Sequence, residues 1–576
     1  MKIPPKGIFI FMQDKQRIAL ISVYNKEGIT DFSKELVNLG WKIISSGGTA
    51  KHLSEAGISV TDVAEITGFP AVLSHRVVTL HPKIHGGLLA LDNTEHLAEM
   101  EKYDIPWIDM ICDDLYPLKE EINKPGATQE SVIEKTDIGG PAFIRSAAKG
   151  RRIVICEVSD RGKVIEWLKA GEPDRENFIN NLAAKAEAVV ARYCSISGEY
   201  HSKGEYKGIF GKKKLECAYG ENAYQKPASL YENLSDVPRP TSDLLAVANW
   251  QLIAGSPMSY NNICDLDRMM QTMTHIGAGF EKNFGKVPKV AIGVKHGNAC
   301  GVGISQKTVF GEFPKDGLLG NIEAVDKMLE GDLRAIFGGS VMVNFNVEEK
   351  IAEELIHKYA GEGRRLLDIV AAPSFSAEAV EILSRKKGKC RLLANKSIEK
   401  AGINSLDQKN RFRYVRGGFL EQPNYTFLPD IAKAAAGVPE SILKNIILAW
   451  AVGCTSNSNT ITLVKDGRLY GNGVGQQDRV GAAKLAIFRA DEAADVGRPV
   501  SGRPTSASAD LENAVAYSDS FFPFPDAVEV LINRGIKNIF STSGSVNDEK
   551  IIEFCKAKGV NLIMLPDSEA RGFYQH

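Results

Sequence analysis

Short apolar runs alternate with amphipathic segments along the first part of the chain, and this alternation constrains the fold most. The runs IALISV (18–23) and WKIISS (41–46) have the length and β-branched content of buried strands. Between them, KEGITDFSKELVNLG (26–40) has helical periodicity and ends on a glycine. Strands that alternate with helices form parallel sheets covered on both faces. We therefore predict an α/β domain with a doubly wound parallel sheet over residues 17–200.

The chain is too long for a single domain. At 576 residues it exceeds what one hydrophobic core supports. A long helix at 177–200 is expected to close the first domain, after an N-terminal extension over 1–16. The polar, Gly- and Lys-rich segment 201–214 is predicted to be a linker. Within 215–576, runs such as KVAIGV, NTITLV and NIFSTS again alternate with helical segments, which predicts two α/β subdomains divided near 390–440.

The overall charge and the cysteines exclude several classes of protein. The formal net charge of −1 argues against a non-specific nucleic-acid-binding protein. The nine cysteines are odd in number and never spaced as CxxC, so neither a disulfide framework nor a zinc knuckle is expected. No stretch approaches the roughly 18 apolar residues of a membrane span, and the first residues lack a signal peptide's cleavage site. We expect a cytoplasmic protein without a membrane or nucleic-acid partner.

The tract VAIGVKHGNACGVG places Lys295 and His296 side by side at the end of a predicted strand. Histidine can take or give a proton near neutral pH, and lysine can hold an oxygen on which negative charge develops. The pair therefore indicates group-transfer chemistry, with an ordinary surface dipeptide as the alternative. The sequence argues against a zinc deaminase, because no Glu stands two residues after His296 and no PCxxC motif follows.

Two glycine clusters in the first domain each precede a predicted helix. SSGGT (45–49) follows a strand, so it is either a phosphate site at a helix N-terminus or a connecting turn. TDIGGPAFIRSAAKG places Asp137 before a helix that carries Arg145 and Lys149. Its Gly pair is a second possible anion site, although Lys149 also fits an ordinary cation at a helix C-terminus.

A histidine-rich tract and an aromatic loop are further candidates. HRVVTLHPKIHGG (75–87) holds three histidines, but Pro82 disrupts the one-face geometry that a metal-binding pair needs. Arg76 and Thr79 facing a phosphorylated ligand are favoured over a metal site. SDSFFPFPD (518–526) fits either a loop that holds a flat ring or part of the core.

Taken together and in order, these tracts resemble the bifunctional purine-biosynthesis enzymes that join AICAR transformylase to IMP cyclohydrolase. The resemblance runs from about Ala19 to His576. It is carried by ISVYNKEG, SSGGTAK, ITGF, TLHPKIHGG, DIGGPA, SYNNI, the Lys-His pair, GDLRAIFGG, VGQQDR and FFPF. It implies a methylglyoxal-synthase-like domain followed by two cytidine-deaminase-like subdomains without zinc, no metal, and a homodimer with transformylase sites at the subunit interface.

The first reaction that the resemblance implies moves a formyl group from 10-formyltetrahydrofolate to the 5-amino group of AICAR. His296 is implied to be the base, Lys295 to hold and polarise the formyl donor, and Asn459 to support the same centre. Further residues are implied to line the nucleotide and folate pockets: Tyr219, Asn262, Gly338, Asp368, Gln476, Arg479, Phe521, Gly544, Ser545 and Arg571. The guanidinium of Arg571 suits the monophosphate.

The second implied reaction closes formyl-AICAR to IMP with loss of water. Proximity favours this step, because nucleophile and carbonyl share one molecule. The resemblance implies that Lys149 is the proton donor or acceptor, with Asp137 and Tyr116 beside it. It also implies a set of residues that hold the phosphate and the ring: Lys26, Ser46, Gly47, Gly48, Thr49, Arg76 and Thr79.

The chain departs from the family pattern at several charged positions. Val78 stands where the family has a lysine, and Asp114 stands where it has an amide. In the second half, Ala218, Tyr224, Cys454 and Asn457 replace basic or titratable residues. These changes leave three hypotheses: a divergent enzyme with both activities, a transformylase on a degenerate cyclohydrolase domain, or a non-catalytic nucleotide sensor. A formyl donor other than the folate also stays open.

Overall fold

The computed structural model describes residues 16–73, 76–233, 243–306, 317–360, 363–435, 437–495 and 508–575. The chain forms two compact units, Met1–Gly211 and Lys212–His576. We describe each unit by itself. Residues 1–15 of the predicted N-terminal extension, and His75 of the histidine-rich tract, lie outside the described residues.

The first unit is built on a five-stranded parallel sheet with the order β3-β2-β1-β4-β5. The strands are β1 (Ile18–Val23), β2 (Lys42–Ser45), β3 (Val60–Asp62), β4 (Met110–Asp114) and β5 (Ile153–Ile155). The helices are α1 (Ile29–Asn38), α2 (Gly47–Glu55), α3 (Val63–Thr67), α4 (Pro82–Leu89), α5 (Thr94–Lys102), α6 (Leu118–Ile122), α7 (Gln129–Glu134), α8 (Gly139–Lys149), α9 (Val158–Lys169) and α10 (Arg175–His201). The predicted parallel sheet is confirmed.

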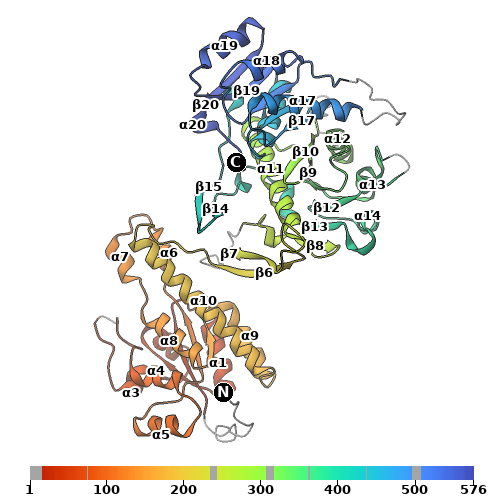
Figure 1. Ribbon diagram of the computed structural model, residues 1–576. Helices are drawn as coiled ribbons and strands as arrows, with labels where there is room; N and C mark the ends of the chain where they lie inside the picture. The colour runs from red at the N-terminus through yellow and green to blue at the C-terminus, as the bar shows by residue number, and fades with distance from the viewer. Residues whose placement is uncertain are drawn as a thin grey trace. The chain divides into compact units, whose positions relative to one another are not determined.

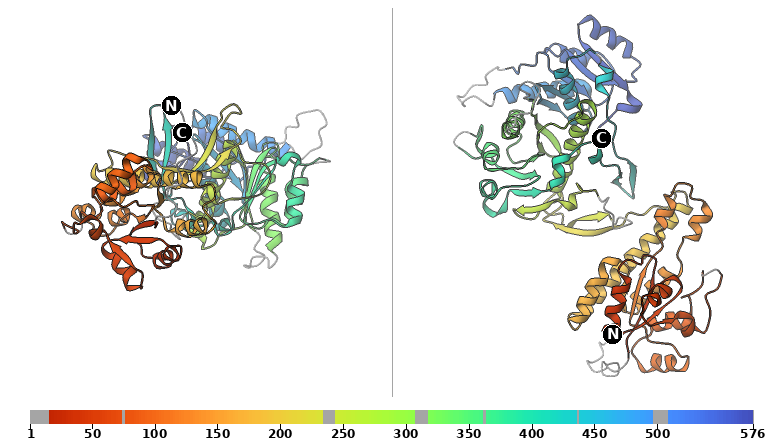
Figure 2. Two further views of the ribbon diagram at one scale, coloured as in Figure 1. Left: turned by 90° about the horizontal axis from the view of Figure 1, so that it is seen from below. Right: turned by 180° about the vertical axis from the view of Figure 1, so that it is seen from behind.

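Helices cover both faces of this sheet (Figures 1 and 2). Successive strand residues point to opposite faces, so Ala19 and Ile21 pack with α1 and α9, whereas Leu20 packs with α4 and α8. Because both faces are buried, the strands are continuous apolar runs. In a parallel sheet all carboxyl ends lie at one edge, which is where doubly wound folds place their ligands.

The second unit is built on one eleven-stranded mixed sheet with the order β20-β19-β18-β16-β17-β10-β9-β11-β12-β13-β8. Its strands are β8 (Gln251–Ala254), β9 (Val290–Lys295), β10 (Asn298–Ile304), β11 (Gly339–Val343), β12 (Leu367–Ala372), β13 (Arg391–Ala394), β16 (Ile461–Lys465), β17 (Arg468–Gly473), β18 (Val515–Ser518), β19 (Asn538–Ser543) and β20 (Asn561–Pro566). Two hairpins stand apart from it: β6 (Gly211–Cys217) with β7 (Ala228–Asn233), and β14 (Asn410–Val415) with β15 (Gly418–Pro423).

The α-helices of this unit are α11 (Tyr260–Phe284), α12 (Gly317–Leu329), α13 (Glu349–His357), α14 (Ala377–Leu383), α15 (Ile431–Ala434), α16 (Glu440–Gly453), α17 (Arg479–Asp495), α18 (Asp526–Ile532), α19 (Asp548–Ala557) and α20 (Asp567–Ala570). Short 3₁₀ turns are η1 (Val247–Asn249), η2 (Lys386–Gly388), η3 (Lys396–Lys400) and η4 (Ile403–Ser405). The segment predicted to be a linker is partly regular, since α10 ends at His201 and β6 begins at Gly211.

The large sheet repeats one arrangement twice. The strands β10-β9-β11-β12-β13 have the same order and directions as β17-β16-β18-β19-β20. In both halves a long buried helix, α11 or α16, precedes the first hairpin, and these two helices pack in one core. The antiparallel pairing of β10 with β17 joins the halves. The two predicted α/β subdomains therefore share one sheet.

Alternate glycines let a helix approach each central strand closely. A Cβ on Gly301 or Gly303 of β10 would lie 2.1 or 2.2 Å from a backbone carbonyl oxygen of α12. A Cβ on Gly471 or Gly473 of β17 would lie 2.0 or 2.1 Å from a carbonyl oxygen of α17. Real side chains do not approach a carbonyl oxygen so closely. Glycine is therefore required in both halves for the helix to pack against the strand.

Gly303→Ala is expected to lower the free energy of unfolding by about 1–3 kcal/mol, because α12 must move away from β10. Gly418→Ala is the control, since a Cβ there meets nothing within 4 Å. Urea unfolding of both variants measures the difference. Equal stability of the two variants would contradict the close approach.

Candidate active sites

The first candidate site lies where the segments after β1 and β2 meet at the carboxyl edge. Lys26, just after β1, donates through Nζ to Thr49 Oγ1 at 3.0 Å and to Val23 O. Thr49 Oγ1 donates to Val23 O at 3.1 Å. Burial lowers the pKa of Lys26, and the charge of Asp114 opposes this shift. Lys26 is thus held against the first turn of α2.

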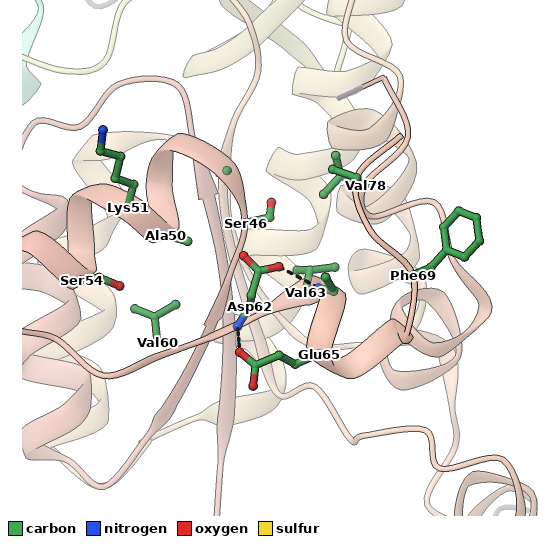
Figure 3. A pocket seen from close by; sticks show the side chains of 13 residues that line it. Ser46, Ala50, Lys51, Ser54, Val60, Asp62, Val63, Glu65, Phe69 and Val78 are labelled. Carbon is green, nitrogen blue, oxygen red and sulfur yellow. Dashed lines mark hydrogen bonds between the residues drawn. The ribbon is translucent and has the colours of Figure 1, made fainter. Parts of the chain in front are cut away.

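The glycine tract after β2 forms the start of α2. Ser46 is the N-cap of this nine-residue helix, and Gly47 and Gly48 are its first residues. A cavity of about 410 Å³ lies beside it, with Val78 and Phe69 on the loop opposite α2 (Figure 3). A helix N-terminus favours an anion through its N–H groups and its dipole. The structure thus places the predicted phosphate loop next to Lys26.

Asp114, which replaces an amide of the family pattern, is charge-balanced by the protein itself. Its carboxylate accepts from the backbone N–H groups of Tyr24 and Asn25 and lies 3.5 Å from Arg161 Nη2. Burial raises the pKa of Asp114, and these partners oppose the rise. Arg161 is itself buried and donates to the carbonyl of Glu27 at 2.5 Å. Asp114 and Arg161 therefore fix the turn that carries Lys26.

Two further carboxyl groups meet at the start of α8. A Cβ on Gly140 would lie 2.5 Å from Asp137 Oδ2 and 2.9 Å from Asp113 Oδ2, so both oxygens face the same point. Asp113 is 4% exposed, and its Oδ2 has no hydrogen-bond partner among the described residues. Burial, followed by the charges of Asp137 and Asp114, raises the pKa of Asp113 well above its usual range. Burial also raises the pKa of Asp137, opposed by the N–H groups of Gly140 and Tyr116.

Of the remaining predicted residues of this unit, Tyr116 and Thr79 lie near the start of α8, whereas Arg76 and Lys149 have other surroundings. Tyr116 packs edge-to-face on Tyr24, with ring centroids 5.7 Å apart, and Thr79 Oγ1 lies at the start of α8. Arg76 is exposed and forms an ion pair with Glu134. Lys149 is the last residue of α8, whereas Asp137 precedes its first residue. From Gly139 to Lys149 the helix rises about 15 Å at 1.5 Å per residue, so Lys149 lies at the opposite end of α8 from Asp137.

The second candidate site is built on the turn between β9 and β10. His296 (φ +53°) and Gly297 (φ +74°) occupy the two central positions of this turn, as Asp466 (φ +51°) and Gly467 (φ +69°) do between β16 and β17. Two-residue hairpins of this kind require positive φ at both positions. The turn therefore presents His296, which is exposed, beyond the end of the strand.

Asp265 of α11 supports this turn. Its Oδ1 accepts from Gly297 N at 2.9 Å, and its Oδ2 accepts from Ser340 Oγ at 3.1 Å. Burial raises the pKa of Asp265, opposed by both hydrogen bonds and by the charge of His296. Lys295, the residue before His296, donates through Nζ to Phe337 O at 2.8 Å, next to the predicted site residue Gly338. Asp265 is thus placed to interact with the imidazole.

Asn459 is connected to the same turn through a short network. Asn298 Nδ2 donates to His296 O at 3.2 Å, and Asn298 Oδ1 accepts from Asn457 N at 3.2 Å. Asn459 Nδ2 donates to Gln476 O at 3.0 Å. The structure therefore brings the loops of His296, Asn459 and Gln476 together, although they come from both halves of the sheet.

A third group of predicted residues surrounds Arg571. Its Nε and Nη2 donate to Ser520 Oγ at 3.1 and 2.7 Å, and the guanidinium lies 5.6 Å from the ring centroid of Phe521. A Cβ on Gly544 would lie 3.8 Å from the Phe521 ring. Ser545 follows Gly544, and both backbone N–H groups donate to the carboxylate of Asp548. Phe521 is partly buried beside Arg571, whereas the next residue, Phe522, is buried in the core with α17 and α18.

The last predicted residues of this unit have structural partners. Arg479 forms a buried ion pair with Asp519, next to Ser520. Asn262 is buried in the capping box of α11. Tyr219 accepts from Tyr260 N at 3.0 Å through its carbonyl, and Asp368 lies 3.5 Å from Arg385 Nη1.

Four charged residues of the candidate sites were not predicted from the sequence: Asp113, Arg161, Asp265 and Arg268. Arg268 donates to Thr455 O at 2.7 Å and to Asn457 Oδ1 at 3.0 Å, and its guanidinium lies 3.7 Å from the ring centroid of Tyr574. Asp113 alone of these residues follows an apolar run, MIC at 110–112, and the other three stand in mixed polar segments without a signal in the sequence.

Neither a metal cluster nor a membrane helix is found in the described part of the chain. No group of three or more His, Cys, Asp or Glu side chains converges there in a metal-binding arrangement. No helix among these residues combines the length and the apolar character needed to cross a bilayer.

Two family models match this chain. "AICARFT/IMPCHase bienzyme" matches residues 147–489, and "MGS-like domain" matches residues 28–142. "Bifunctional purine biosynthesis protein PurH" of Bacillus mycoides is 36% identical over 560 residues, which cover 95% of this chain and 98% of that protein. The protein of the same name from Anoxybacillus flavithermus is 36% identical over 565 residues, with the same coverage. A solved chain described as "Crystal structure of ForH" is 31% identical and matches 33% of this chain and 100% of that chain, with a TM-score of 0.31.

The Asp113 carboxyl is expected to make stability depend on pH. Because its pKa is raised on folding, the folded state loses stability as pH rises from about 4 toward the folded pKa. In Asp113→Asn this loss disappears. The free energy of unfolding of the variant minus that of the wild type should therefore be larger at pH 8 than at pH 4.5 by at least about 1 kcal/mol, since one pKa unit corresponds to about 1.4 kcal/mol. Urea titrations at both pH values measure this, with the exposed Asp31→Asn as control. Parallel pH dependence of wild type and Asp113→Asn would contradict the burial of an ionisable Asp113.

Proposed function

The chain belongs to the AICARFT/IMPCHase bienzyme family, and from that membership we propose which residues perform each of its two reactions. It is a bifunctional enzyme of purine biosynthesis, an AICAR formyltransferase and IMP cyclohydrolase. The observation that carries the residue assignment is the β9–β10 turn, which presents His296 beside Asp265.

Formyl transfer needs a base, because the 5-amino group of AICAR is conjugated with the imidazole ring and is a poor nucleophile. We assign this role to His296, whose imidazolium the nearby Asp265 would stabilise. Lys295 would polarise the formyl oxygen as the amine attacks the formyl carbon. Asn459 would orient the donor through its amide, held by Gln476.

The nucleotide and the formyl donor each need residues that bind them. Arg571 is the proposed partner of the monophosphate, because its guanidinium is 44% exposed and a phosphate would compete for it with Ser520 and with Asp567, whose Oδ2 lies 3.3 Å from Nε. Phe521 and Gly544 would leave room for a flat ring beside it. We propose 10-formyltetrahydrofolate as the formyl donor and no metal ion, in keeping with the family.

Ring closure would take place in the first unit. The N-terminus of α2, with Ser46, Gly47, Gly48 and Thr49, and Lys26 would hold the phosphate of formyl-AICAR. Asp137 and Tyr116 would carry the proton transfers. The raised pKa of Asp137 favours its protonated form relative to a free carboxyl group, which suits a group that donates a proton to the leaving oxygen. We assign no proton transfer to Lys149, which lies at the other end of α8.

We further propose that the protein is a cytoplasmic homodimer. The nine cysteines are all free, as expected in a reducing compartment. The β14–β15 hairpin exposes apolar side chains away from the large sheet, with Tyr414 80% and Leu420 59% exposed. Exposed apolar groups of this kind fit a contact with a second copy of the chain.

His296→Ala is expected to lower formyl transfer by about 10²–10⁴-fold, because the base is removed. Release of tetrahydrofolate from AICAR and 10-formyltetrahydrofolate measures it. Closure of pre-formed formyl-AICAR should be unchanged, since it takes place in the other unit. Asp466→Ala alters the corresponding position of the second hairpin and serves as the control. Unchanged formyl transfer in His296→Ala would remove His296 from the mechanism.

Asp137→Asn is expected to lower ring closure by at least about 10²-fold while formyl transfer is retained, because the amide cannot exchange a proton. IMP formation from formyl-AICAR, followed by ultraviolet absorbance, measures this. Asp109→Asn, at the opposite end of β4, is the matched control, since Asp109 is also a partly buried carboxyl. If the wild type does not accelerate closure, the degenerate-domain hypothesis holds instead.

A further inference from the structure

Lys135 lies beside the ring-closure site and has no role in the mechanism above. It follows α7 and precedes Asp137 by two residues. Its Nζ lies 5.6 Å from the ring centroid of Tyr24 and 5.8 Å from that of Tyr116. Tyr24 follows β1 and Tyr116 follows β4, so the ammonium lies beside the two strand ends that carry the reacting groups.

The backbone that carries Lys135 is held in place by the buried Tyr193 of α10. The hydroxyl of Tyr193 accepts from Asp137 N at 2.7 Å and donates to Lys135 O at 3.3 Å. One phenol thus fixes both ends of the turn that joins Lys135 to Asp137. The ammonium and the proposed acid–base carboxyl are therefore positioned together.

Other cations near this site are engaged by the protein. Lys26 donates to a backbone carbonyl and a hydroxyl, Arg161 bonds Asp114 and backbone carbonyls, and Arg76 forms an ion pair. No hydrogen bond or ion pair joins Lys135 Nζ to another residue in the described part of the chain. An ammonium placed over two aromatic rings keeps its charge available to a ligand.

Ring closure creates a need for such a charge. The carboxamide nitrogen bonds to the formyl carbon and loses one proton, while the carbonyl electron pair moves to the oxygen. That oxygen then leaves as water, and the formamido nitrogen loses its proton as the C=N bond forms. The negative charge that develops on the oxygen is opposed by the carboxylates of Asp114 and Asp137. Val78, at the position where the resembling enzymes have a lysine, brings no cation.

We propose that Lys135 stabilises the developing charge on the formyl oxygen, in place of the lysine missing at position 78. The proposal rests on the ring closure assigned above to the first unit. Lys135 is then a catalytic residue, and Tyr24, Tyr116 and the turn to Asp137 hold it in place.

The test compares ring closure of formyl-AICAR by the full-length protein and its variants. Lys135→Met keeps the length of the side chain but removes the charge, and should lower kcat by about 10–10³-fold with little change in KM. Lys135→Arg should retain much of the rate. Lys102→Met is the matched control, because Lys102 lies 4.9 Å from the Tyr103 ring centroid on α5, outside the site. Val78→Lys, added to Lys135→Met, should restore activity.

The outcomes separate this proposal from the assignment of ring closure. Absence of closure by the wild type would overturn both. Closure by the wild type and equal kcat in Lys135→Met would overturn the role of Lys135 alone. A loss of kcat that neither Lys135→Arg nor Val78→Lys relieves would show a merely structural role and would also overturn it. Formyl transfer, measured on the same preparations, should be unchanged in every variant.

Discussion

The pairing of β10 with β17 is the interaction on which the proposed formyl-transfer site depends. It joins two copies of one five-stranded arrangement into a single sheet. His296 comes from the first hairpin, whereas Asn459 precedes the second hairpin and Gln476 follows it. Only the joined sheet brings these loops into one network through Asn298. The alternate glycines of both strands allow this junction to be covered by α12 and α17.

The repeated arrangement also gives the His296 turn a counterpart in the second half of the sheet. Both hairpins have a Lys before the turn and Gly at its second central position, with positive φ at both central residues. The difference lies at the first central position, which is His296 in one half and Asp466 in the other. The backbone requirement is therefore the same in both halves, and a single side chain distinguishes the turn that we propose as catalytic from the other one.

Much of the fold could be predicted from the sequence, because buried strands are distinctive. The run at 18–23 coincides with β1 and the run at 538–543 with β19. Both runs contain apolar and β-branched residues and are bounded by turn residues. The shared sheet could not be predicted, because the two hairpins have little sequence in common beyond the turn. Lys149 was expected beside Asp137, but a helix separates residues that a short motif places together.

The effect of the charged positions that depart from the family could not be predicted from the sequence either. A sequence position shows which charge is missing but not which neighbour replaces it. Asp114 is balanced by Arg161, and Asn457 accepts from Arg268, both distant in sequence. The local charge is thus a property of the folded neighbourhood. The loss of a cation at Val78 is therefore weak grounds for expecting the loss of ring closure, since another cation stands beside the same strand ends.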